Sequence, residues 1–318
     1  MKARKIIKTP NVMAWVLVAL LPGLAGMTFY LGLGVVWNLF WLSAFCLATE
    51  VLVVALKNGS LATANLRAPL HNNLGDGTTL LAAWLIAICL PPYVSIQILA
   101  VAALASIGLA KHAYGGLGNN IFNPAMVGYA VILLSFPQAL AAWPALEGVE
   151  NLGADTLSGA TYLSEFRYRD AMTVDEFLLN SPQVLHQQII AGLFLLGGLG
   201  LIYLRIISWR IPLALLITVG LLASVTYDQG STQSMGSAWF HWTTGGTIAA
   251  AFFVATDPVT HPSRHSHQVI FAVSIGILLF VIRTQGNLPD GIAFAILLAN
   301  CATPLLNRIH RQRESRHV

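Results

Sequence analysis

The feature that most constrains this fold is a series of helix-length apolar segments that carry almost no charge. Of 318 residues, 56% are hydrophobic and 9% are charged, whereas about a quarter of the residues in soluble domains are charged. A helix needs about 20 apolar residues to cross a bilayer. We therefore predict an all-α integral membrane protein with about ten transmembrane helices. The expected spans are Val12–Tyr30, Val35–Leu56, Gly77–Leu90, Val94–Ala110, Pro124–Ala142, Gln187–Leu204, Trp209–Ser224, Gly245–Thr256, Gln268–Ile282 and Pro289–Leu306.

The distribution of basic residues predicts the orientation. With the N-terminus in the cytoplasm, 14 of the 17 Lys and Arg residues fall in inside segments, and only Arg167, Arg169 and Arg283 fall outside. Cytoplasmic loops of membrane proteins carry such an excess. We expect a multi-pass protein of the bacterial inner membrane with both termini cytoplasmic. The basic residues serve orientation and lipid contact in this interpretation, so no nucleic-acid partner is expected.

One long hydrophilic loop divides the chain into three parts. Residues 1–142 form an N-terminal membrane repeat of five spans, residues 143–186 an external loop, and residues 187–318 a C-terminal repeat of five spans. The loop holds seven of the 13 acidic residues, as expected of a translocated segment. We predict that it lies in the periplasm.

The two membrane parts resemble each other. Ser106–Gly108 recurs as Ser274–Gly276, 168 residues later, and Pro124 and Pro289 are 165 residues apart. Five spans is an odd number, so the two repeats are expected to be inverted. Such repeats often form a site from short, broken helices. The short segments Gly77–Leu90 and Gly245–Thr256 predict two half-sites, one near each face, with ordinary interrupted packing as the alternative.

The loop contains a motif with a specific chemistry. Asp155-Thr156-Leu157-Ser158-Gly159-Ala160-Thr161 fits D-x-x-S-G-A-T, the pattern at which flavin transferases join FMN through its phosphate to the final Thr. Asp155, Ser158, Gly159 and Ala160 would be recognised, and Thr161 would carry the flavin. Small residues keep the backbone accessible to an enzyme. A plain small-residue loop is the alternative.

The predicted linkage is a phosphodiester with one negative charge. We expect Arg167, Arg169 or Arg283 to neutralise it, because these are the only cations on the outside face.

Several other side chains are candidates for an ion path or a metal site. Ionisable groups within a bilayer are costly and usually face a cavity or a partner. Glu50 lies deep in the second span, and Asp76, Asp257 and Asp290 lie at the ends of broken segments. An ion path and a helix cap remain alternative roles for these acids. His261, His265 and His267 form a polar cluster whose default interpretation is a solvated loop, and no metal site is predicted.

Four stretches carry a family resemblance: Lys111–Tyr129, Asp155–Thr161, Phe253–Thr260 and Leu288–Ala295. Together they resemble the family of the D subunit of the Rnf (Rsx) electron-transport complex. At greater distance they are similar to the B subunit of the sodium-pumping NADH:quinone oxidoreductase. The Thr260–His267 loop departs from the family pattern in being rich in histidine.

The resemblance implies a subunit of a redox-driven translocase with no complete active site of its own. FMN would be bound covalently at Thr161, and a second flavin, riboflavin, is an expected non-covalent cofactor. Partner subunits would carry iron–sulfur clusters and flavin, and a flavin transferase would act during maturation. Electron transfer between NADH and ferredoxin would be coupled to movement of Na+ or H+. A small-solute transporter or channel with the same inverted-repeat plan, and a non-catalytic scaffold, are the competing interpretations.

Overall fold

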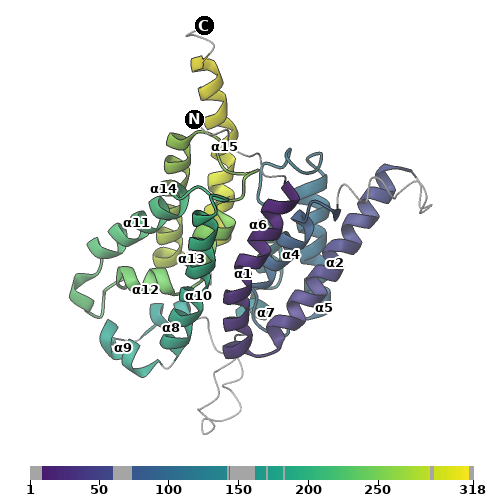
Figure 1. Cartoon of the computed structure of the whole chain (residues 1–318). Helices are drawn as coiled ribbons and strands as arrows, with labels where there is room; N and C mark the ends of the chain where they lie inside the picture. Colours follow the sequence, from purple (N-terminus) through teal and green to yellow (C-terminus); the bar gives the residue numbers. More distant parts are fainter. Residues whose placement is uncertain are drawn as a thin grey trace.

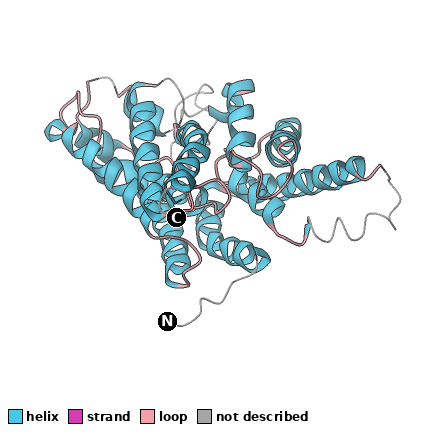
Figure 2. Cartoon of the chain, turned by 90° about the horizontal axis from the view of Figure 1, so that it is seen from above, coloured by secondary structure: helices cyan, strands magenta, loops and turns pink. Residues whose placement is uncertain are grey.

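A computed structural model describes residues 9–59, 74–141, 143, 162–169, 171–181, 183–286 and 290–314. Every regular element in this part is helical (Figure 2), which confirms the predicted all-α class. Each of the ten predicted apolar segments contains helix. These helices are α1 (Thr9–Leu31), α2 (Gly34–Lys57), α4 (Thr78–Ala87), α5 (Ile96–Ala103) with its π-helical continuation η1 (Leu104–His112), α6 (Pro124–Ser135), α10 (Gln183–Tyr203), α11 (Arg210–Val225), α13 (Thr247–Ala249) with its π-helical continuation η3 (Ala250–Val254), α14 (His265–Gln285) and α15 (Ile292–Glu314).

Length and composition suit these helices to a membrane. In the described part, four helices are long and apolar enough to cross one: Pro10–Leu31, Gly34–Lys57, Val184–Tyr203 and His265–Gln285. Five further apolar helices are shorter. The molecule therefore has the character of a multi-pass membrane protein.

Contacts between helix ends fix the relative directions of three of the first five segments: α2, α4, and α5 with η1. Asn38, near the start of α2, donates to Pro91 O over 2.7 Å and accepts from Val94 N over 3.1 Å. The chain after α4 therefore returns to the start of α2. At the other end of α2, Lys57 contacts His112, the last residue of η1. Thus α4 runs opposite to α2, and α5 with η1 runs alongside α2 in the same direction.

Contacts near helix ends also position α10, α11 and α14 in the second set of helices. The ring of Tyr30, at the end of α1, stacks on that of His186, at the start of α10, with centroids 4.5 Å apart. These two helices are therefore antiparallel. Ser208, just before α11, donates to Gln268 near the start of α14. Figure 1 shows the start of α1 and the last turns of α15 at the upper end, with the short helices α8 (Tyr162–Arg167), α9 (Val174–Asn180) and α12 (Ala238–Thr243) at the lower end.

One hydrophobic core joins the two sets of helices. It includes the fully buried Leu20, Leu42 and Ile86 as well as Phe253 and Phe271. Small residues bring the helices together: a Cβ on Gly128 would lie 2.8 Å from the carbonyl oxygen of Ala102. Glycine in membrane helices commonly serves such close packing.

One predicted boundary is wrong. The segment expected to be a single helix over Pro124–Ala142 ends as α6 at Ser135, and a separate helix, α7 (Pro137–Ala141), follows. The cause is Pro137, which lacks a backbone N–H and disfavours a helical conformation in the preceding residue. Phe136 accordingly has φ −135° and ψ 52°.

Candidate functional site

The predicted flavin motif, Asp155–Thr161, lies outside the described residues, and with it Asp155, Ser158, Gly159, Ala160 and Thr161. The described chain resumes immediately after Thr161, where Tyr162 begins α8. The position of α8 therefore indicates where the chain that follows the motif is attached.

A small second core attaches α8 and α9 to the rest of the molecule. Phe166, Val174, Phe177 and Phe240 bury their side chains together. Arg169 lies over the ring of Phe166, with the guanidinium carbon 4.2 Å from the centroid. Burial of Arg169 lowers the pKa of its guanidinium. Its side chain donates to five main-chain carbonyls, those of Phe166, Met172, Ser231, Thr232 and Ser234.

At the start of α13 lies a group of residues that we name the arginine cluster: His241, Gly245, Thr247, Arg283 and Asp290. Arg283 Nη1 donates to Thr247 Oγ1 over 2.7 Å and to His241 O over 3.2 Å. Its Nη2 donates to Gly245 O over 2.8 Å, and both Nε and Nη2 contact the Asp290 carboxylate. All five N–H groups of the guanidinium therefore have partners within the protein.

These contacts bear on the three cations predicted to neutralise a flavin phosphate. Arg169 and Arg283 are already engaged, the first with carbonyls and the second with an ion pair. The guanidinium carbon of Arg167 lies 5.7 Å from the ring centroid of Tyr168, and no residue in the described part of the chain accepts a hydrogen bond from it. The geometry favours Arg167 among the three.

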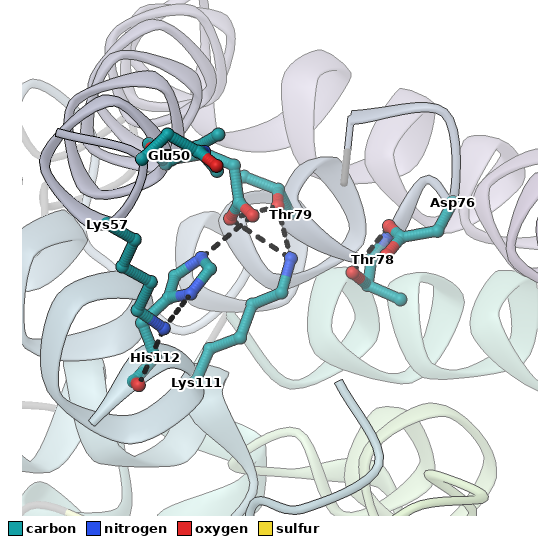
Figure 3. Close-up of polar contacts among 9 residues, drawn as sticks. Glu50, Lys57, Asp76, Thr78, Thr79, Lys111 and His112 are labelled. Atoms are coloured by element: carbon teal, nitrogen blue, oxygen red, sulfur yellow. Dashed lines mark hydrogen bonds and ion pairs between the residues drawn. The ribbon is translucent and has the colours of Figure 1, made fainter. Parts of the chain in front are cut away.

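A second buried group, the lysine cluster, lies at the start of α4: Glu50, Lys57, Thr79, Lys111 and His112 (Figure 3). Glu50 is 0% exposed. One carboxylate oxygen accepts from Lys111 Nζ over 3.0 Å and from Thr79 Oγ1 over 2.8 Å. The other lies 2.8 Å from His112 Nε2. Lys111 Nζ also donates to Thr79 Oγ1 over 2.9 Å. A buried carboxylate needs such partners, because desolvation of an unpaired charge is expensive.

Lys57 sets the tautomer of His112. Its ammonium lies 3.2 Å from His112 Nδ1 and donates to His112 O over 3.1 Å. An ammonium can only donate, so Nδ1 accepts and the ring proton is on Nε2. The imidazole then donates that proton to Glu50. A continuous hydrogen-bonded path thus runs from exposed Lys57 to fully buried Glu50.

A pocket of about 110 Å³ lies beside the lysine cluster, where the two sets of helices meet. Its walls are mostly apolar and include residues of α1, α4 and η3. Its polar lining residues include Lys111, Thr78, Asn123 and Asp257. Asn120 also lines it, and its Oδ1 is buried without a hydrogen-bond partner among the described residues. The pocket can therefore take a mostly apolar ligand with a polar edge.

The remaining predicted acids are bonded to main-chain N–H groups at helix starts or turns. Asp76 Oδ1 accepts from Thr78 N over 2.8 Å, and Asp290 Oδ1 from Ile292 N over 3.3 Å. Asp257 Oδ1 accepts from Val259 N over 3.2 Å. Asp76 and Asp290 thus bond the first N–H groups of α4 and α15 from two residues upstream, whereas Asp257 bonds a turn that follows η3.

His261 and His265 of the predicted polar loop have different hydrogen-bond partners. His261 Nδ1 contacts Pro262 O and lines the pocket, while His265 Nδ1 contacts Gln268. His267 follows in the first turn of α14. In the described part of the chain, no three metal-ligating side chains gather in one place.

Sequence reasoning found Glu50 but missed its partners. Lys111 and Lys57 were counted only as loop cations that orient the chain, and Arg283 as an available outside cation. The structure buries Lys111 (2% exposed) and Arg283 (8% exposed). The available signal was one unbalanced acid within an apolar span, which requires a buried cation from elsewhere.

The protein is therefore of the helical membrane class. It carries one ion pair beside the start of α4 and another beside the start of α13. Comparison with known proteins defines the family: the model of the NQR2, RnfD, RnfE family matches residues 2–316, and the chain belongs to this family. Several curated relatives are named as the D subunit of an ion-translocating oxidoreductase complex. One from Pseudomonas aeruginosa (strain UCBPP-PA14) is 36% identical, covering 99% of this chain and 94% of its own. Those from Ectopseudomonas mendocina and Buchnera aphidicola are 35% and 30% identical, with coverage of 98% and 93% of this chain and 92% of each relative.

Proposed function

We propose that this chain is the membrane subunit of an ion-translocating oxidoreductase complex and carries electrons through FMN attached covalently to Thr161. The observation that carries the proposal is the match, over almost the whole length of both chains, to relatives named as the D subunit of such a complex. The motif D-T-L-S-G-A-T supplies the attachment site. Of the predicted phosphate partners, Arg167, six residues after Thr161, is the one with no hydrogen-bond acceptor among the described residues.

The topology we propose is ten crossings in two inverted repeats, with both termini in the cytoplasm and the flavin loop in the periplasm. Two observations support it. The pocket lining supports opposite directions for α4 and α13 with η3: Thr78 at the start of α4 and Thr256 just after η3 line the same pocket, so one helix starts where the other ends. The distribution of basic residues supports the same orientation.

The pocket beside Lys111 is our candidate site for a second, non-covalent flavin, riboflavin. An isoalloxazine ring is flat and largely apolar, with hydrogen-bonding atoms along one edge. The apolar walls suit its face, and the buried, unpartnered Oδ1 of Asn120 suits a ring N–H. Lys111, which lines the pocket, would supply a positive charge to a flavin bound there. A flavin there would supply one-electron and two-electron redox chemistry, and this chain's residues would bind, orient and charge-balance it.

The proposed partners follow from the same assignment. Other subunits of the complex, including iron–sulfur and flavin subunits, would exchange electrons with this chain, and a flavin transferase would load Thr161. Electron transfer between NADH and ferredoxin would drive Na+ or H+ across the membrane. An inverted-repeat transporter or channel for a small solute is the alternative, and it has no use for a flavin on Thr161.

The test is in-gel flavin fluorescence after SDS denaturation, with expression in a host that has an active flavin transferase. We expect a fluorescent band for the wild type and none for Thr161→Ala. Thr156→Ala, which removes another hydroxyl from the same motif, is the matched control and should remain fluorescent. A dark wild-type band, with the transferase active on a control protein, would refute the covalent flavin and favour the transporter.

A further inference from the structure

Within the lysine cluster the buried pair Glu50 and Lys111 sums to zero charge, and the cluster contains no second acid; the charge of Lys57 lies at the exposed end of the cluster. Lys111 lies beside the first turn of α4, where the free N–H groups of a helix carry partial positive charge. The Glu50 carboxylate is the counter-charge that offsets both. The other groups facing Glu50 are neutral: Thr79 from α4, the His112 imidazole from η1, and the buried thiol of Cys46 one turn earlier on α2.

Lys111 contacts both the Glu50 carboxylate and the adjacent pocket. Its ammonium is bonded to Glu50 and Thr79, while the same side chain lines the pocket. The long, flexible side chain can turn its charge toward a new anion. A negative charge in the pocket would therefore compete with Glu50 for Lys111.

We propose that Glu50 is a proton-binding site that exchanges its proton with the surface at Lys57 through His112, and that negative charge in the adjacent pocket drives its loading. The inference rests on the proposed function for the origin of that charge, a reduced flavin. Before loading, Glu50 and Lys111 sum to zero; after loading they leave one positive charge beside one negative charge in the pocket. Electroneutrality in a low-dielectric region favours this pairing.

The transfer follows the hydrogen bonds already present. Lys57 gives one ammonium proton to His112 Nδ1, forming an N–H bond there, while the Nε2–H bond breaks and its proton passes to the Glu50 carboxylate. The products are a neutral Lys57 amine, a neutral His112 with its proton on Nδ1, and a Glu50 carboxylic acid that donates to Nε2. The neutral Lys57 amine then turns into the solvent, where Lys57 is exposed, and takes up a proton from a buffer acid, so the net reaction moves one proton from solution to Glu50. Unloading Glu50 runs the same path in reverse and restores the original tautomer.

The first measurement is redox-induced infrared difference spectroscopy on the whole complex in lipid nanodiscs, with flavin content and reduction recorded on the same sample. We expect reduction to produce the carbonyl band of a protonated carboxylic acid. Glu50→Gln should remove the band, and His112→Gln should slow its appearance at least tenfold. Asp76→Asn, which alters a nearby acid that only caps α4, is the control and should keep the band. A flavin that is reduced with no Glu50-dependent band overturns the proton site and leaves the proposed function standing.

A second measurement needs no flavin. Nitrogen-15 NMR of histidine-labelled protein, assigned by comparison with His112→Gln, reports the tautomer of His112. We expect the Nε2–H form in the wild type and a shift toward a mixture in Lys57→Met. A doubly protonated ring or an Nδ1–H form in the wild type overturns the relay, whatever the flavin content.

Discussion

The lysine cluster and the arginine cluster share one arrangement of helix start, threonine and buried cation, but they differ in how firmly the cation is held. In each, an interrupted helix begins after a left-handed glycine, Gly77 with φ 74° and Gly246 with φ 72°. A threonine hydroxyl in the first turn, of Thr79 or Thr247, then accepts from a buried cation at the end of a neighbouring helix.

The cation makes the difference between them. Arg283 has a rigid fork with every N–H group bonded, three of them to Gly245 O, His241 O and Thr247 Oγ1. Lys111 has a rotatable ammonium between Glu50, Thr79 and a pocket. Arginine suits a fixed network and lysine a movable charge. The arginine cluster therefore fixes the start of α13, whereas the lysine cluster can respond to charge.

The largest expected effect comes from removing the movable cation. Lys111→Met leaves Glu50 buried without its ion-pair partner, and breaking a buried pair in this way costs about 3–5 kcal/mol. The free energy of unfolding, measured by denaturant titration in mixed micelles, should fall by that amount. Lys111→Met combined with Glu50→Gln removes both charges and should recover most of the loss. A single variant as stable as the wild type would show that the pair is not the stabilising element.

A pH effect of similar size is expected on the arginine cluster. His241, on α12 and outside the predicted spans, has its pKa lowered from 6.5 to about 4, mainly by burial and further by the charge of Arg283. A histidine with a lowered pKa binds protons more tightly when unfolded, so its penalty is absent above pH 6.5 and grows as pH falls toward 4. The stability lost over that window is about 3 kcal/mol.

His241→Gln supplies the control for this pH dependence. The glutamine side chain is neutral throughout, so the loss of stability between pH 6.5 and 4 should shrink in the variant. Thermal unfolding followed by circular dichroism at several pH values measures it. An unchanged pH profile in His241→Gln would place the acid sensitivity elsewhere in the molecule.

The positions of the apolar helical segments could be predicted from the sequence alone. Apolar runs predicted where the ten helical segments lie, because burial in lipid or in a core demands such runs. The helix caps at Asp76 and Asp290 were also among the predicted roles, since an acid followed by glycine at a helix start has a local meaning.

The side chains that form the two clusters could not be predicted from neighbouring residues in the sequence. Glu50 and Lys111 are 61 residues apart and meet only because α2 and η1 pack together. Nothing beside Lys111 distinguishes it from a loop lysine that orients the chain. The short helices α8, α9 and α12 were also missed, because they lie in or beside hydrophilic stretches, although Thr173 and Glu176 form a capping box that marks α9.

The smallest effect tests whether the two glycines are equivalent. Both have positive φ, and a non-glycine residue in this conformation costs about 1–2 kcal/mol. At Gly246 an added Cβ would meet Ile292 Cδ1 at 3.7 Å, an ordinary contact, so Gly246→Ala should cost about 1 kcal/mol. At Gly77 the added Cβ would lie 3.2 Å from Met13 Cβ, and α1 would have to shift. Gly77→Ala should therefore be the more destabilising variant in the same micelle titration. Equal losses would mean that backbone conformation alone sets the cost, and that α1 yields to the added methyl group beside Met13, a residue that lines the pocket.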